Sequence, residues 1–62
     1  MKSEQFNEIF NVGDDVVYMN DFGHKEYVKT RSEAWTLGDG ITAVVLLDGK
    51  TGGYDISRIS KA

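Results

Sequence analysis

Apolar residues recur at helical spacing near the start of the chain. Phe6, Ile9 and Phe10 fall on one face of a helix with about 3.6 residues per turn. Ser3 is a residue type that caps helix N-termini, and Glu4 follows it where a negative charge suits the helix dipole. The pattern predicts a short helix from about Ser3 to Phe10.

The next segments alternate as strands do. Residues 15–19, DVVYM, are rich in β-branched and aromatic side chains, which favours a strand. In KEYVKTR, residues 25–31, alternation places Tyr27, Lys29 and Arg31 on one face and smaller residues on the other. This pattern predicts a second strand with one wet face.

The segment ITAVVLL, residues 41–47, is apolar on both faces. Such a strand is typical of the centre of a sheet that is covered on both sides. Its second face could pack against the N-terminal helix, the rest of the sheet structure or a second copy of the chain.

Turn signals follow this central strand. Asp48-Gly49 predicts a type I′ hairpin turn flanked by Leu47 and Lys50, because that turn needs positive φ at both central residues. Gly52 and Gly53 weaken the returning strand and indicate a bulge or a close backbone approach. The segment DISRI predicts one helical turn before a last short strand, Arg58 to Ser60.

Short strands joined by tight turns favour a small closed or half-closed barrel, since closure removes unpaired sheet edges. The succession VGDDVVY, YVKTR, ITAVVLLDGKTGGY and DISRI resembles an SH3-like barrel of the bacterial and phage kind over residues 12–60. The stretch from TRSEAW to DISRI is similar to short uncharacterised proteins of phages and mobile elements. We therefore predict an all-β fold, a small SH3-like barrel of about five short strands with a short N-terminal helix. Residues 1–11 form the helical segment and residues 12–62 the barrel.

Composition narrows the classes of function. Seven basic and ten acidic residues give a formal net charge of −3, which works against non-specific binding to phosphate backbones. The absence of cysteine excludes disulfides and thiolate metal sites and fits a reducing compartment. No apolar run approaches the ~20 residues that cross a bilayer, and the N-terminus lacks the apolar core of a signal peptide. We expect a cytoplasmic domain without a membrane segment or a cofactor.

Few residues could perform catalysis. His24 is the only histidine, and no poised nucleophile or further metal ligand accompanies it. Asp14 and Asp15 are adjacent, so a strand would point them to opposite faces. The chain resembles the type II plasmid dihydrofolate reductases in its Gly13-Asp14 and Arg58-Ile59 pairs, but TGGYDI stands in place of their Val-Gln-Ile-Tyr motif. An oligomeric enzyme of that kind is a remote alternative, and no catalytic residue is carried over.

A nucleic-acid-binding module is the main alternative function. KOW-type modules share the broad fold, and the resemblance implies a basic patch near the first loop. Lys25, Lys29 and Arg31 could form this patch, with Tyr27 available to stack on a base. Nearby carboxylates nearly balance the local charge, so a solvated strand face is the competing interpretation.

A protein partner is the leading hypothesis. Trp35, Arg31, Tyr27 and Tyr54 are residue types enriched at interface hot spots. Trp35 could instead plug one end of the core, an interpretation that we favour slightly over a binding anchor. We therefore predict a non-enzymatic protein-binding domain, monomeric or homodimeric, whose partner is a host protein if a phage or mobile element encodes it.

Overall fold

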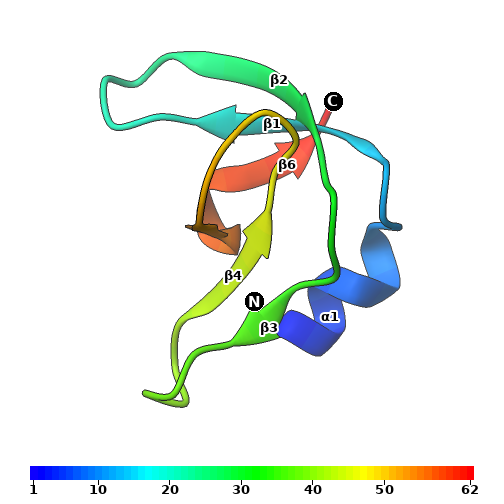
Figure 1. Ribbon diagram of the computed structural model, residues 1–62, viewed down its shortest axis with the longest axis vertical. Helices are drawn as coiled ribbons and strands as arrows, with labels where there is room; N and C mark the ends of the chain where they lie inside the picture. The colour runs from blue at the N-terminus through cyan, green and yellow to red at the C-terminus, as the bar shows by residue number, and fades with distance from the viewer.

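The computed structural model describes all of residues 1–62. It is mostly β-structure with one short α-helix, as the sequence predicts (Figure 1). In chain order the elements are α1 Ser3–Ile9, β1 Asp15–Met19, β2 Lys25–Lys29, β3 Trp35–Thr36, β4 Ala43–Leu46, β5 Gly53–Asp55, the 3₁₀ turn η1 Ile56–Arg58, and β6 Ile59–Lys61. None of the helices has the length and apolarity needed to span a membrane.

Six strands form two antiparallel three-stranded sheets, ordered β2-β1-β6 and β3-β4-β5. The chain runs from β2 into β3, and so passes from one sheet to the other (Figure 1). Along this path Thr30 forms an isolated bridge with Leu47, beside the end of β4. The all-β prediction is therefore confirmed, but the strands number six instead of about five, and the two sheets are not closed into one barrel.

The core lies between the sheets and under the helix. Nine buried residues form one cluster: Phe6, Phe10, Val16, Tyr18, Ala34, Ala43, Val45, Leu47 and Ile56. The rings of Phe6 and Phe10 stack with their centroids 4.3 Å apart. The helix thus supplies aromatic surface that a domain this small needs, because short chains bury a low fraction of their surface.

The start of α1 differs from the prediction. The N-cap is Lys2, whose backbone N–H donates to the Gln5 side chain at 2.9 Å. Ser3 is the first helical residue and is buried, with its hydroxyl 3.0 Å from that of Thr36 in β3. The prediction of Ser3 as N-cap is wrong because its hydroxyl serves a tertiary contact.

The helix also covers the backbone edge immediately before β3. The Asn7 side chain donates to the Ala34 carbonyl at 3.0 Å and accepts from the Ala34 N–H at 2.8 Å. One amide side chain thereby takes the place that a neighbouring strand would occupy. Covering an edge in this way prevents unwanted strand pairing.

Local signals placed several boundaries well. The predicted strand over residues 15–19 coincides with β1, and the predicted helical turn in DISRI is η1. Lys50 N–H donates to the Leu47 carbonyl around Asp48-Gly49, which confirms the turn position. Its type differs, since Gly49 has a φ of 78° but no non-glycine residue has positive φ. A type I′ turn would need positive φ at Asp48 as well.

Candidate functional site

The four residues predicted to bind a partner do not form one cluster. Trp35 pairs with Val44 across the β3–β4 ladder, whereas Tyr54 pairs with Val45 across the β4–β5 ladder. Adjacent strand residues point to opposite faces. Trp35 and Tyr54 therefore lie on opposite sides of the β3-β4-β5 sheet.

Tyr54 faces the interior, where it joins a polar cluster between the sheets. Its ring meets Tyr18 edge to face, with centroids 5.0 Å apart. The Lys50 ammonium lies 5.6 Å from the Tyr18 ring centre and 5.7 Å from that of Tyr54. Glu26 completes the cluster 2.6 Å from Lys50, which lowers the pKa of Glu26 and raises that of Lys50. Tyr54 thus serves to join the two sheets.

Arg31 is committed to backbone carbonyls. Its Nε donates to the Leu47 carbonyl at 3.1 Å, and its Nη2 donates to the Lys50 carbonyl at 3.0 Å. These bonds tie the end of β2 to the turn after β4. Arg31 therefore uses its Nε and Nη2 donors to stabilise the fold, and these two donors are not free to bind a partner.

Trp35 lies on the outer face of its sheet. The side chain is 41% exposed, so the interpretation of Trp35 as a core plug is wrong. A Cβ placed on Gly53 would lie 2.7 Å from Val44 Cγ2 and 3.5 Å from Trp35 Cη2. Trp35, Val44 and the Gly53 backbone are therefore packed together outside the core. The close approach predicted at the glycines occurs at Gly53, and the indole covers part of the second face of β4.

Two aliphatic residues extend this exposed surface along the β3–β4 hairpin. Leu37 N–H donates to the Thr42 carbonyl at 2.8 Å, which continues the ladder beyond β3. Leu37 follows Trp35 by two positions, so it lies on the same face, and it is 41% exposed. Ile41 follows the hairpin turn and is 87% exposed. We call Trp35, Leu37 and Ile41 the hairpin face.

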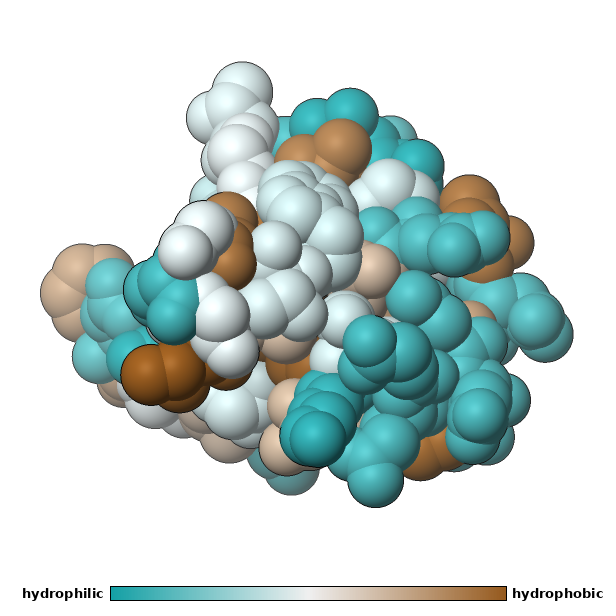
Figure 2. All heavy atoms as spheres, turned by 90° about the horizontal axis from the view of Figure 1, so that it is seen from below, coloured by the Kyte–Doolittle hydropathy of each residue, from teal (hydrophilic) through white to brown (hydrophobic).

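The hairpin turn itself is held by Asp39. Its carboxylate accepts from the backbone N–H groups of Ile41 and Thr42, both at 2.9 Å, and from the Thr42 hydroxyl at 2.7 Å. These bonds lower the pKa of Asp39. Viewed from below, hydrophilic residues predominate on one half of the molecule and pale residues on the other, with brown residues scattered over both halves (Figure 2).

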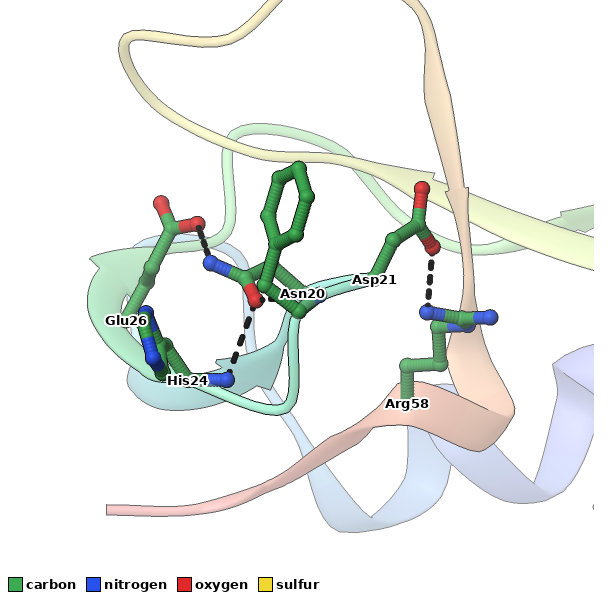
Figure 3. A network of polar contacts seen from close by, with 6 residues as sticks. Asn20, Asp21, His24, Glu26 and Arg58 are labelled. Atoms are coloured by element: carbon green, nitrogen blue, oxygen red, sulfur yellow. Dashed lines mark hydrogen bonds and ion pairs between the residues drawn. The ribbon is translucent and has the colours of Figure 1, made fainter.

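A second ordered turn lies between β1 and β2. The Asn20 side chain accepts from the N–H groups of Phe22 and His24, at 2.9 and 3.0 Å, and donates to Glu26 at 3.0 Å. Figure 3 shows this arrangement together with Asp21, which pairs with Arg58 of η1 at 2.7 Å. The turn leaves Phe22 84% exposed. Sequence reasoning assigned this segment only as turn material and missed Phe22.

Three of the four residues proposed for nucleic-acid binding lie on one exposed face of β2. Lys25, Tyr27 and Lys29 alternate with half-buried positions along β2, and Tyr27 is 75% exposed. Lys29 pairs with Asp15 of β1 at 2.7 Å, which raises the pKa of Lys29. A shallow hollow of about 470 Å³ adjoins this face and is lined by Asp15, Tyr27, Val28, Lys29, Asp48 and Ala62. Arg31 keeps its positive charge, but two of its donors are engaged by the Leu47 and Lys50 carbonyls and are not free to contact a phosphate.

No group of three or more His, Cys, Asp or Glu side chains is placed to hold a metal ion. His24 contributes its backbone N–H and carbonyl to the β1–β2 turn. No known protein-family model, curated protein or solved structure matches this chain. The assignment of function therefore depends on the exposed faces described above.

Proposed function

We propose that this protein is a non-enzymatic binding module that docks a protein partner on the hairpin face. The observation that carries the proposal is that one hairpin, β3–β4, exposes three large apolar side chains, Trp35 and Leu37 on one strand face and Ile41 after the turn. Apolar groups that remain together on the surface of a small domain are typical of interaction sites. Tryptophan is among the residue types most enriched at interface hot spots.

We further propose that the two sheets are the halves of an SH3-like barrel. Support comes from the path of the chain, because β2 leads through the Thr30–Leu47 bridge directly into β3 of the second sheet. A 3₁₀ turn before the last strand, Ile56–Arg58, agrees with the resemblance. In this proposal the hairpin face lies on the outside of the barrel, on the β3-β4-β5 sheet.

Replacing Ile41 by serine is expected to weaken partner binding while the fold persists. Ile41 is 87% exposed, so its loss removes apolar contact area from the interface and none from the core. A contact of this size is worth about 1–2 kcal/mol, or roughly a tenfold change in affinity. Affinity capture from cell lysate, quantified for the wild type and the variant side by side, measures this change.

Phe22→Ser is the matched control for this experiment. Phe22 is equally exposed, at 84%, but it lies on the β1–β2 turn. The control is expected to retain the partner that Ile41→Ser loses. Equal retention by both variants would remove the hairpin face from the proposal.

Nucleic-acid binding is the second candidate, favoured by the alignment of Lys25, Tyr27 and Lys29 on one exposed strand face. If this face binds single-stranded RNA or DNA, Tyr27→Ala removes a stacking platform worth about 1–3 kcal/mol. Affinity should also fall steeply with salt, because binding releases counterions from the phosphates. Fluorescence anisotropy with labelled oligonucleotides over a range of salt concentrations tests both expectations. Absent or salt-independent binding would eliminate this candidate.

A further inference from the structure

We infer that the partner segment docked on the hairpin face is basic as well as apolar, a peptide in which Lys or Arg stands beside an aliphatic or aromatic side chain. This inference rests on the proposed protein-binding function and specifies the chemistry of the partner. Its basis is the distribution of charge around the hairpin face, taken together with the exposed indole of Trp35.

The charges around the hairpin face are acidic. Asp39 forms the turn between Leu37 and Ile41, and its pKa is lowered by the hydrogen bonds that it accepts. Asp55 pairs with Val44 across the ladder, so it lies on the same side of the sheet as Trp35. The hydrogen bond from Ser57 N–H lowers the pKa of Asp55 as well. Both carboxylates are exposed and ionised at neutral pH.

No basic residue of the chain stands at an outward position of this sheet. Lys50 pairs with Glu26 and Arg31 donates to two carbonyls. Arg58 pairs with Asp21 and also lies near enough to Asp55 to help lower its pKa. The others are Lys2 before α1, Lys25 and Lys29 on β2, and Lys61 near the Phe10 ring. Neither carboxylate forms an ion pair within the protein; no cation of the chain acts on Asp39, whereas Arg58 and the N-terminal ammonium help to lower the pKa of Asp55.

Trp35 supplies a second reason to expect a cation. The indole ring attracts Lys and Arg more strongly than the other aromatic side chains do. In the free protein this ring is partly exposed, and no cation of the chain lies over it. A partner with a basic side chain next to an apolar one could contact Trp35, fill the space beside Leu37 and Ile41, and pair with Asp39 or Asp55. Opposite charges at the rim of an interface raise specificity and association rate.

Selection from a library of short random peptides displayed on phage tests this inference. The full chain is immobilised as wild type, as Ile41→Ser, and as the double variant Asp39→Asn with Asp55→Asn. The asparagines keep one acceptor oxygen for the backbone bonds of both turns and remove the two charges. Peptides retained by the wild type are expected to be enriched in Lys or Arg beside Leu, Val, Ile or aromatic residues, and to be lost on Ile41→Ser. Their affinity for the double variant is expected to be about fivefold weaker, as two exposed charge pairs contribute modestly.

Trp35 reports directly on these complexes because it is the only tryptophan. Retained peptides that lack tryptophan should shift its fluorescence emission to shorter wavelength as the indole loses contact with water. Peptides that depend on Ile41 but show no basic preference would overturn the charge inference and leave the protein-binding function in place. The absence of any Ile41-dependent peptide would also overturn the inference, and the lysate capture then decides the proposed function separately. A solution mass that rises with concentration in the wild type but not in Ile41→Ser would assign the face to a second copy of the chain, against both proposals.

Discussion

Replacing Phe6 by alanine is expected to remove most of the stability of this protein. Phe6 is 2% exposed and stacks on Phe10 in the core cluster. Truncating a buried phenylalanine costs about 3–5 kcal/mol, because the lost transfer energy is increased by the cavity left behind. A domain of 62 residues has a total free energy of unfolding of roughly 3–9 kcal/mol. Urea unfolding followed by circular dichroism measures how much of it remains.

Ile9→Ala is the matched control on the same helix. Ile9 is 44% exposed and lies outside the core cluster, so its truncation is expected to cost less than about 1 kcal/mol. Alanine also has the higher helix propensity, which offsets part of the lost contact. Equal losses in the two variants would mean that Phe6 contributes no more to the core than an exposed helical residue does.

The elements that sequence predicted well are those with a local cause. The apolar spacing of Phe6, Ile9 and Phe10 is a property of neighbouring residues, and it located α1. Phe6 and Phe10 enter the core as this spacing predicts, but the prediction for Ile9 is wrong, because Ile9 is 44% exposed. Gly49 likewise marks the turn after β4, because glycine adopts positive φ without steric cost. Only the turn type escaped prediction, since it depends on the backbone angles of Asp48.

Elements that depend on distant partners were not predictable in the same way. The sequence extended the central strand back to residue 41, whereas β4 begins at Ala43. The Asp39 carboxylate binds the N–H groups of Ile41 and Thr42, which draws these residues into the turn. Ile41, expected on a wholly apolar strand face, is consequently exposed. The two-residue strand β3 depends on pairing with β4 and on the cover that Asn7 provides.

The candidate site shows the same limit. Residue type identified Trp35 as a candidate anchor, but type alone could not place Tyr54 on the opposite side of the sheet, because that placement follows from strand register. Arg31 was selected for its guanidinium, whose acceptors are contributed by residues 47 and 50. The Asp48-Gly49 turn fixes only the side on which Tyr54 lies, because Trp35 is placed by the separate turn between β3 and β4.

Gly53→Ala is expected to destabilise the protein by about 1–3 kcal/mol, the usual cost of overpacking a filled space. The added methyl carbon would lie 2.7 Å from Val44 Cγ2 and 3.0 Å from Val44 Cβ. Valine has little rotamer freedom, so the side chain cannot turn away and β5 must shift instead. Gly38→Ala is the control, since a methyl group there meets nothing within 4 Å and Gly38 does not have positive φ. Thermal unfolding of both variants gives the comparison.

Coupling between Gly53 and Val44 separates a steric cause from a general loss of backbone freedom. Val44→Ala removes the Cγ2 atom at 2.7 Å and leaves the contact with Val44 Cβ at 3.0 Å. The double variant is therefore expected to be more stable than the sum of the two single changes predicts, with an interaction energy of about 1 kcal/mol. Because Trp35 Cη2 lies 3.5 Å from the same point, Gly53→Ala should also change the fluorescence emission of the lone tryptophan. If the two losses are additive and the emission is unchanged, Gly53 does not position Trp35. The indole would then be held on the hairpin face by its packing against Val44 alone.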